Sequence, residues 1–312
     1  MATIIGPGSS NVDVTGYAPR LPSAGETVLG TTLKIGPGGK GLNQMTAARR
    51  AGSDVVFISR YADDAFGSVL RACYRAEQIP ETYISCIEGG QTGCALIEID
   101  QSDAQNRIMV LPGVTQRVTA DLVTAAEADF AACDAVLTQL EIPFETVTAA
   151  KELAAKYNKP FILNPAPFRP LPDGWLCGVD WLTPNETEAA LLTGVSIEKI
   201  PEDAATAAQK ILAMGVKNAV ITLGVHGAYW TNGQESCHVG GIKVDAVDTT
   251  GAGDTFNGAL ATAIGEGFPV AAALQFANAA AAVSVTRHGA AVSCPTRQEI
   301  EDMMHRHYGQ DA

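Results

Sequence analysis

Residues 247–260 read VDTTGAGDTFNGAL, a stretch that sets two aspartates six positions apart on either side of a glycine turn. The residues that follow the turn, TFNGALATAI, are small or apolar and predict a buried helix. The turn at 251–253 therefore precedes a helix N-terminus, where free N–H groups and the helix dipole favour an anion. Because a buried carboxylate needs a hydrogen bond, a counter-charge or a bound cation, both Asp248 and Asp254 require an explanation.

Asp254 would lie in the first turn of that helix, where a capping role is the simpler interpretation. Capping leaves Asp248 unexplained. A carboxylate beside an anion-binding turn is also the arrangement that moves a phosphoryl group onto a hydroxyl, because the carboxylate accepts the proton and the N–H groups stabilise the transferring charge. The stretch thus suggests phosphoryl transfer, with Asp254 as the base.

The composition excludes several classes of protein. The chain has 312 residues, 46% of them hydrophobic and 18% charged, which indicates a globular protein with a sizeable core. The formal net charge of −13 argues against a general nucleic-acid binder. Seven scattered cysteines without a C-x-x-C pair favour reduced thiols in a cytoplasmic protein over a zinc site or a disulfide framework. The N-terminus has no signal-peptide pattern, and the apolar region near 255–285 is interrupted, so we expect no membrane partner.

Short apolar runs alternate with helical patterns, beginning with TIIGPG, GLNQMTAARRAG, DVVFIS and AFGSVLRACYRAEQ. This alternation predicts an α/β fold in which helices cover both faces of a mostly parallel sheet. Residues 12–36 and 92–111 break the rhythm, because they contain strand-like pieces and turns but no helix. We predict that they form a small β-sheet appendage on a core made of 1–11, 37–91 and 112–312. One face of such a sheet needs a ligand, a second subunit or both.

Two motifs near the N-terminus point to a polar ligand. GPGGKG at 36–41 matches G-x-G-x-x-G but follows the appendage, which disfavours a dinucleotide site, and its Lys40 is not followed by the Ser or Thr of a Walker P-loop. It is either a glycine turn whose N–H groups approach a ligand or a plain helix start. Asn11 and Asp13 lie on one side of an extended chain, which suits vicinal hydroxyls, although a solvated strand face is equally consistent.

A third motif, LTPNETEAALLTG at 182–194, places Asn185 and Glu188 at a strand-to-helix junction. Magnesium held through water and carboxylates is one interpretation. The other is an ordinary N-terminal cap with acidic residues favoured by the helix dipole.

Taken together, these motifs resemble the ribokinase-like (PfkB) carbohydrate kinases over nearly the whole chain, and within them the ribokinase group. The stretches that carry the resemblance are GSSNVDV, AGETVLG, IGPGGKGLNQ, TQLEIP, LNPAP, TPNETEA, ITLGVHGAYW, VDTTGAGDTFNG and VSVTRHGAAVSCP. The resemblance implies a three-layer α/β/α sandwich with a β-sheet lid, and ATP-dependent phosphorylation of a sugar's primary hydroxyl, with ribose giving ribose 5-phosphate. It leaves open 2-deoxyribose, another sugar or a nucleoside as acceptor, and more distantly a sugar- and ATP-binding sensor without catalysis.

The resemblance also implies a role for each matching position, with ATP, Mg²⁺ and K⁺ as cofactors and a homodimer formed through the lid. The catalytic set is the base Asp254 with the anion hole Gly251, Ala252 and Gly253. The sugar-binding set is Asn11, Asp13, Gly39, Lys40, Asn43 and Glu141, with Ala95, Ile97 and Ile108 closing from the lid. The nucleotide and magnesium set is Asn185, Glu188, Thr222, Gly224, Gly227 and Asn278. The potassium set is Asp248, Thr250, Ser284, Arg287, Gly289 and Ser293, several of them through backbone carbonyls.

The chain departs from the family pattern at two places near the junction of lid and core. The usual PGAN is PGVT here, ending at Thr115, and the usual VGxDxxG is RYADDAFG, with Arg60 and Tyr61 in place of small residues. Both departures bear on the choice of sugar and not on the chemistry.

Overall fold

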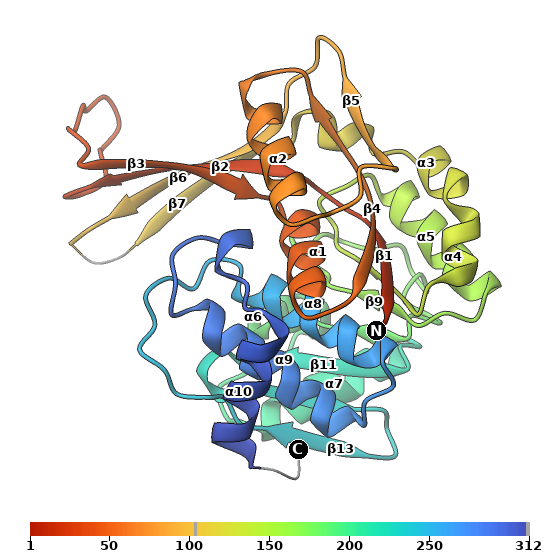
Figure 1. Ribbon diagram of the computed structural model, residues 1–312. Coiled ribbons are helices and arrows are strands. Elements are labelled where there is room, and N and C mark those ends of the chain that lie inside the picture. Colours follow the sequence, from red (N-terminus) through yellow and green to blue (C-terminus); the bar gives the residue numbers. More distant parts are fainter. Residues whose placement is uncertain (103–104, 310–312) are drawn as a thin grey trace.

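A nine-stranded sheet forms the centre of the protein in the computed structural model, which describes residues 1–102 and 105–309 (Figure 1). The strand order is β13-β12-β11-β10-β9-β8-β1-β4-β5. Neighbours from β11 to β5 run parallel, whereas β12 is antiparallel to β11 and to β13. The strands are β1 Thr3–Pro7, β4 Asp54–Ala62, β5 Ile84–Ile87, β8 Ala135–Thr138, β9 Phe161–Leu163, β10 Trp181–Leu182, β11 Asn218–Thr222, β12 Ala228–Thr231 and β13 Ser236–Val239.

Helices cover both faces of this sheet. Ile4 and Ile5 of β1 are both fully buried but belong to different hydrophobic clusters, because successive strand residues point to opposite faces. The Ile5 face packs against α3 Ala120–Ala125, α4 Glu127–Ala132, α5 Phe144–Lys156, α6 Glu186–Thr193 and α7 Glu202–Ala213. The opposite face packs against α1 Lys40–Arg50, α2 Ala65–Ala76, α8 Ala252–Gly265, α9 Val270–Ser284 and α10 Arg297–Tyr308. The predicted three-layer α/β/α architecture is confirmed. Within the described residues, the helices are too short or too polar to cross a membrane.

A second, four-stranded sheet projects from the core as an arm (Figure 1). Its order is β3-β2-β6-β7, with β2 Asn11–Ala18, β3 Thr32–Gly38, β6 Gly93–Asp100 and β7 Asn106–Leu111. The predicted appendage of two separate segments is therefore present, and we call it the lid. Because β2 begins at Asn11 and β3 ends at Gly38, both strands run past the predicted boundaries at 12 and 36.

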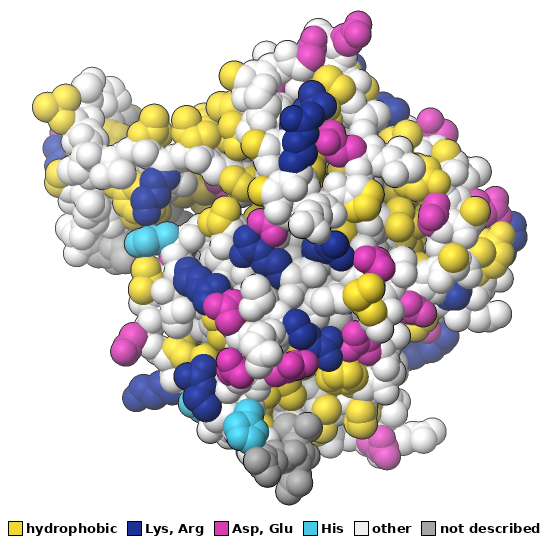
Figure 2. Space-filling model, viewed as in Figure 1, with side chains coloured by type: hydrophobic (Ala, Val, Ile, Leu, Met, Phe, Trp, Pro, Cys, Tyr) yellow, Lys and Arg dark blue, Asp and Glu magenta, His cyan; other side chains and the backbone are white. Residues whose placement is uncertain are grey.

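The two faces of the lid differ in that one carries Asp13, although both expose apolar side chains, with Ile108 and Val110 on the Asp13 face. The register aligns Asp13 with Ala95, and Ile97 with Ile108, on one face. The other face carries exposed apolar side chains, namely Leu33, Ile35, Leu96, Met109 and Leu111. Hydrophobic side chains are visible along the surface of the arm in Figure 2. We call these five residues the apolar lid face.

Candidate active site

The glycine turn before α8 has the shape that the sequence predicts. Gly251 adopts a left-handed conformation with φ 75°. A Cβ at this position would lie 2.9 Å from both the Cα and the Cβ of Ala290, so conformation and space both require glycine here. A Cβ on Gly253 would instead meet nothing within 4 Å, so the backbone at Gly253 is open to a ligand.

The N–H groups of this turn are mostly free to bind an anion. Within the described residues, no protein acceptor takes the N–H of Gly251, Gly253 or Asp254. The N–H of Ala252, which we predicted as part of the anion hole, donates to the carbonyl of Thr249 at 3.2 Å. Three unused donors at the positive end of a 14-residue helix form a site for a negatively charged group.

Asp254 is buried at the start of α8 and is held from α1. The Asn43 Nδ2 donates to Asp254 Oδ2 at 2.9 Å, and the Gln44 Nε2 donates to Asp254 Oδ1 at 3.0 Å. Both carboxylate oxygens therefore have a fixed direction before any substrate is present. The sequence analysis found Asn43 but missed Gln44, although an adjacent pair of amides in a buried helix was a signal for it.

A chain of buried amides and a hydroxyl continues from Gln44. Its Nε2 also donates to Asn164 Oδ1 at 3.1 Å, and the Asn164 Nδ2 donates to the carbonyl of Thr183 at 3.0 Å. The Thr183 hydroxyl donates to Asn257 Oδ1 at 2.5 Å, and the Asn257 Nδ2 donates to the carbonyl of Gly253 at 2.8 Å. The chain thus starts at the carboxylate of Asp254 and returns to the turn beside it. None of its four linking residues, Gln44, Asn164, Thr183 and Asn257, was among the predicted site residues.

The predicted sugar-binding residues cluster where β2 leaves the core. The Thr115 hydroxyl donates to Asn11 Oδ1 at 3.1 Å and thereby orients that amide. Glu141 Oε2 accepts bonds from the backbone N–H of Lys40 at 3.0 Å and from the Ser9 hydroxyl at 2.5 Å. Since the Gly41 N–H also donates to Ser9 Oγ, at 3.1 Å, these helix-start N–H groups are used by the protein, which supports the helix-start interpretation of GPGGKG.

Charges on this side of the site are strongly coupled. Burial raises the pKa of Asp13 to about 7, helped by the negative charges of Glu141 and Asp254 and opposed by Lys40. The negative charge of Asp254 is the main cause that raises the pKa of Lys40, whose ammonium also lies near Glu141, Glu188 and Asp13. The lysine therefore stays charged and balances a group of acids.

The three lid residues predicted to close over the sugar differ in exposure. Ala95 is buried next to Asp13 in the register, and Ile97 is half-buried. Ile108 lies on the same face, but 57% of it is exposed. This face therefore extends outward past the residues that surround Asp254.

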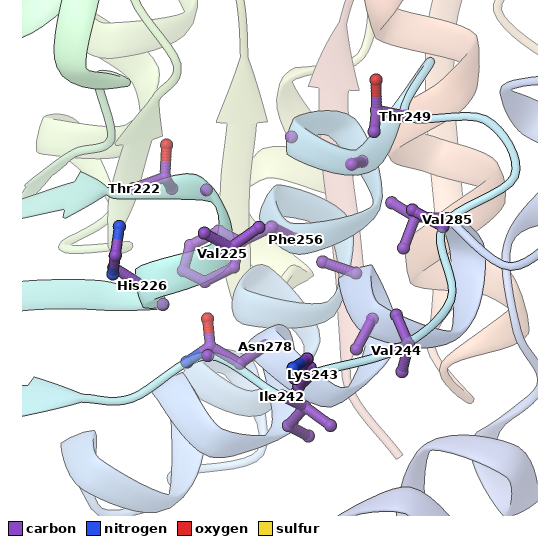
Figure 3. Close-up of a pocket in the computed structure, with 18 of the residues that line it drawn as sticks. Thr222, Val225, His226, Ile242, Lys243, Val244, Thr249, Phe256, Asn278 and Val285 are labelled. Atoms are coloured by element: carbon purple, nitrogen blue, oxygen red, sulfur yellow. The ribbon is translucent and has the colours of Figure 1, made fainter.

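Two cavities meet at the glycine turn. The smaller, of about 170 Å³, is lined by Asp254, Lys40 and Asn164 among others. The larger, of about 690 Å³, is mainly apolar and is shown in Figure 3. It brings together the predicted nucleotide positions Thr222, Gly224, Gly227 and Asn278 with the apolar side chains Val225, Ile242, Val244, Phe256 and Val285. Ala252 and Gly253 line both cavities, so the turn separates the carboxylate from the larger one.

Asn185 and Glu188 form a capping box at the start of α6. The Glu188 N–H donates to Asn185 Oδ1 at 2.8 Å, and the Asn185 N–H donates to Glu188 Oε2 at 3.0 Å. The capping interpretation is therefore confirmed. Both residues also line the smaller cavity, and burial raises the pKa of Glu188. Their predicted role toward magnesium stays a prediction.

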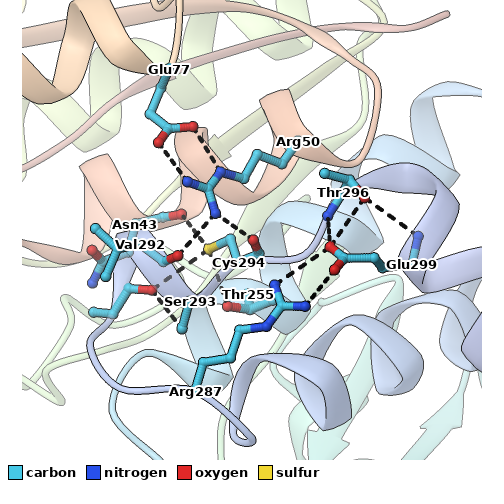
Figure 4. Close-up of polar contacts among 11 residues, drawn as sticks. Asn43, Arg50, Glu77, Thr255, Arg287, Val292, Ser293, Cys294, Thr296 and Glu299 are labelled. Atoms are coloured by element: carbon cyan, nitrogen blue, oxygen red, sulfur yellow. Dashed lines mark hydrogen bonds and ion pairs between the residues drawn. The ribbon is translucent and has the colours of Figure 1, made fainter.

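Asp248 joins two loops of the predicted cation site. Its carboxylate accepts the N–H of Thr250 at 2.9 Å and of Gly289 at 3.0 Å. Burial opposes the charge, but these hydrogen bonds outweigh it and lower the pKa of Asp248. The guanidinium of Arg287 binds Glu299 (Figure 4), so only the backbone of Arg287 is available to a cation.

The remaining predicted cation ligands are hydroxyls and backbone groups. Ser284 and Ser293 each donate their hydroxyl to a carbonyl at 2.8 Å, which leaves oxygen lone pairs to accept or coordinate. In the part of the chain that the structure describes, no group of three or more His, Cys, Asp or Glu side chains could hold a metal. One carboxylate with hydroxyl and carbonyl oxygens suits a hard cation and not zinc.

The comparison with protein families decides the class. The model described as "pfkB family carbohydrate kinase" matches residues 1–297. This chain belongs to the pfkB family. As a pfkB carbohydrate kinase it transfers a phosphoryl group to an alcohol group of a sugar.

Relatives of this kinase are similar over almost their whole length. A protein named ribokinase from Haemophilus influenzae is 39% identical over 297 residues, covering 95% of this chain and 96% of the relative. A protein named deoxyribokinase from Salmonella typhi is 33% identical over 298 residues, covering 95% and 97%. The solved structure described as Arabidopsis thaliana ribokinase complexed with ribose and ATP has a TM-score of 0.90 at 31% identity, covering 97% of this chain and 98% of that one.

The two departures from the family pattern place buried side chains among different neighbours. Thr115, at the first departure, is 1% exposed and bonds Asn11, a predicted sugar-binding residue. Tyr61, at the second, is 6% exposed and packs in the core with its ring centroid 6.1 Å from that of Tyr74. Of these two side chains, it is therefore Thr115 that reaches the sugar-binding set.

Proposed function

We propose that this kinase phosphorylates the primary hydroxyl of D-ribose with ATP, giving D-ribose 5-phosphate and ADP. The observation that carries the proposal is the glycine turn shared by two cavities, with Asp254 on the side of the smaller one. In this geometry Asp254 takes the hydroxyl proton while the sugar oxygen forms a bond to the γ-phosphorus and the bond from that phosphorus to ADP breaks. The free N–H groups at 251, 253 and 254 stabilise the transferring charge.

The smaller cavity supports a compact polyhydroxylated acceptor. Its lining is polar and includes Lys40, Asn164 and Asp254, while the nearby Asn11 and Asp13 add an amide and a carboxylate. The lining residues include no aromatic side chain, which a nucleoside base would use for stacking. The similarity to proteins named ribokinase supports ribose in particular.

The larger cavity supports ATP as the phosphoryl donor. Its apolar walls suit an adenine ring, and its inner end reaches the free N–H of Gly253, where the γ-phosphate would lie. Asn185 lines both cavities and Glu188 lines the smaller one, and the two would hold Mg²⁺ through water, since their oxygens suit a hard cation. When bound, the metal neutralises phosphate charge.

A monovalent cation fits the loops around Asp248. The N–H groups of Val247 and Asp248 both donate to the carbonyl of Val285, at 2.7 and 3.1 Å, which keeps the two loops side by side. Asp248 and the oxygens of Thr250, Ser284, Arg287, Gly289 and Ser293 would hold K⁺, because carbonyl and carboxylate oxygens can replace its hydration shell. When bound, the ion would add positive charge next to the turn at 251–253.

The apolar lid face supports a homodimer. The five side chains of this face, Leu33, Ile35, Leu96, Met109 and Leu111, are between 39% and 64% exposed, and the same face of a second copy would cover them.

The dimer is tested by sedimentation of the variants Met109→Glu and Leu96→Glu, which should be monomers where the unaltered protein is a dimer. Leu191→Glu is the control, because Leu191 is 57% exposed on α6, away from the lid. An unaltered protein that sediments as a monomer contradicts the dimer.

The experiment that tests the acceptor is ADP release with Mg-ATP and potassium across ribose, 2-deoxyribose, fructose and adenosine. We expect the highest kcat/KM with ribose. No turnover of ribose together with good turnover of adenosine would contradict the proposal. Sugar binding without any turnover would favour a sensor.

A second acceptor, 2-deoxyribose, is favoured by one observation, the 33% identity to a protein named deoxyribokinase. A kcat/KM for 2-deoxyribose above that for ribose would replace the first proposal with this one. The base and the anion-binding turn would keep their roles.

A further inference from the structure

The last turn of α1 carries an arginine that reaches away from its own helix. The Nε and Nη2 of Arg50 bind the carboxylate of Glu77 at 2.7 and 2.6 Å. Its Nη1 donates to the carbonyls of Val292 at 3.0 Å and Cys294 at 2.5 Å (Figure 4). The planar guanidinium allows both, because one edge makes the paired bonds to the acid and the other edge stays free for the carbonyls.

The segment 289–294 that Arg50 holds touches three parts of the active site. The N–H of Gly289 binds Asp248, and Ala290 packs against the Gly251 turn so closely that a Cβ there would clash. At the other end, Cys294 Sγ lies 3.4 Å from the hydroxyl of Thr255, which follows Asp254 on α8. A shift of this segment would therefore move the carboxylate of Asp248 and the turn together.

We propose that Arg50 is a positioning residue, which acts through the carbonyls of Val292 and Cys294 to set segment 289–294 against Asp248 and Gly251. Neither of the two cavities at the turn includes Arg50 in its lining, so it does not act on a ligand there directly. Glu77, the residue that directly follows α2, fixes the guanidinium, and the side chains of the pair are only 24% and 13% exposed. The inference rests on the proposed function, because it assigns the segment a role in phosphoryl transfer.

The neighbouring Arg49 separates this role from a general effect of charge. Both arginines lie in the last turn of α1, where a cation is favoured by the helix dipole. Arg49 also pairs with an acid, Asp54 at 3.0 Å, and donates to a carbonyl, that of Ser53 at 3.3 Å. Within the described residues, Arg49 makes no hydrogen bond or ion pair with segment 289–294. A contribution to helix stability alone would make the two residues equivalent.

The experiment compares Arg50→Met, Arg50→Lys and Arg49→Met in the full chain. Steady-state kinetics with ribose and ATP are measured with hydrogen exchange of residues 247–253 and 285–294 and with the potassium dependence of the thermal midpoint. We expect Arg50→Met to lower kcat on the order of tenfold, since small misplacements near the chemistry are costly. The KM for ribose should stay within about twofold, because the substitution leaves the contacts that bind the sugar equally in the ground and transition states unchanged.

Two further readouts distinguish positioning from stability. Exchange should become faster in 289–294, and the potassium concentration for half of the thermal shift should rise several-fold. Arg50→Lys should fail to restore kcat, because an ammonium cannot serve the acid and two carbonyls in the same way. Arg49→Met should match the unaltered enzyme in kcat and exchange.

Three results would overturn the proposal: unchanged exchange and kcat in Arg50→Met, equal losses in Arg49→Met, or full restoration by Arg50→Lys. Should Arg50→Met not fold, Glu77→Gln weakens the same pair and should give a smaller change in the same direction, and no change would overturn the proposal. An unaltered protein without sugar turnover would contradict the proposed function instead. In that case unchanged exchange in Arg50→Met still overturns the positioning role.

Discussion

Asp254 and Asp248 belong to one short stretch of chain, yet the protein holds them by different means. Side-chain amides of Asn43 and Gln44 bind the carboxylate of Asp254, whereas backbone N–H groups of Thr250 and Gly289 bind that of Asp248. Side-chain donors can aim a carboxylate from a rigid helix without linking it to loop movement. Backbone donors make the carboxylate part of the two loops themselves. The first arrangement suits a base and the second suits a site that closes when a cation binds.

Of the substitutions that separate the two aspartates, Asp254→Asn should have the largest effect on kcat. Loss of the base should lower kcat by about 10²–10⁴-fold, while the Kd for ribose from titration calorimetry should change little. Asp245→Asn is the matched control, because Asp245 is an exposed aspartate in the loop before the same turn. Near-normal turnover by Asp254→Asn would show that another group takes the proton.

Removing one of the amides that hold Asp254 should cost less. In Gln44→Met the carboxylate keeps its charge but loses a donor and the connection to Asn164. We expect kcat to fall on the order of tenfold, with an unchanged KM for ribose. Thr46→Val, two positions on, removes a buried hydroxyl that has no partner within the described residues, and should leave kcat unchanged. Equal effects of the two variants would mean that Gln44 is needed only for folding.

Asp248→Asn should act through potassium alone. Replacing Li⁺ by K⁺ at fixed ionic strength should raise kcat/KM several-fold in the unaltered enzyme, and this response should disappear in the variant. Without potassium the two proteins should have similar activity, because Asp248 does not take part in proton transfer. An unaltered enzyme that ignores potassium would make Asp248 a link between loops and no more.

The last effect, on binding and not on turnover, concerns a third carboxylate, Asp13, to which no described group donates a hydrogen bond. With its pKa at about 7, it is mostly protonated below that pH and a full acceptor above it. The affinity for ribose should therefore rise with pH between 6 and 8, by at most about tenfold per unit. Asp13→Asn should bind ribose with no such pH dependence. A flat profile in the unaltered protein would contradict the assignment.

The same group affects stability in the opposite direction. The folded protein keeps a proton on Asp13 up to about pH 7, whereas the unfolded chain releases it near the ordinary value of 3.8. The contribution of Asp13 to the free energy of unfolding should therefore fall as pH rises between these values. Asp13→Asn should flatten that part of the curve in chemical denaturation.

What could be predicted from the sequence was local. The stretch 247–260 contains the predicted base, the turn and the helix start within one contiguous run, so its pattern alone predicts its shape. The lid could be predicted because two segments lack helical patterns. Partners far apart along the chain were not accessible in this way: Gln44 meets Asp254 at a separation of 210 positions, and Arg50 meets Cys294 at 244.

Competition for hydrogen bonds was the other limit on what the sequence could predict about the site. The pattern GPGGKG fits either a glycine turn with N–H groups near a ligand or a plain helix start, and the structure shows that the N–H groups of Lys40 and Gly41 are used by Glu141 and Ser9. A single sequence shows which donors exist and not which acceptors reach them first.

The lid is not a separate cover, because β2 carries the predicted sugar-binding residues Asn11 and Asp13 at its base and pairs along its length with β3 and β6, two strands that carry part of the apolar lid face. Any swing of this strand would withdraw both predicted partners of the sugar and uncover the sugar at the same time. The time that the product stays bound should therefore depend directly on the motion of the lid. A change that stiffens the arm would slow the escape of sugar phosphate even if it touched no atom of the substrate.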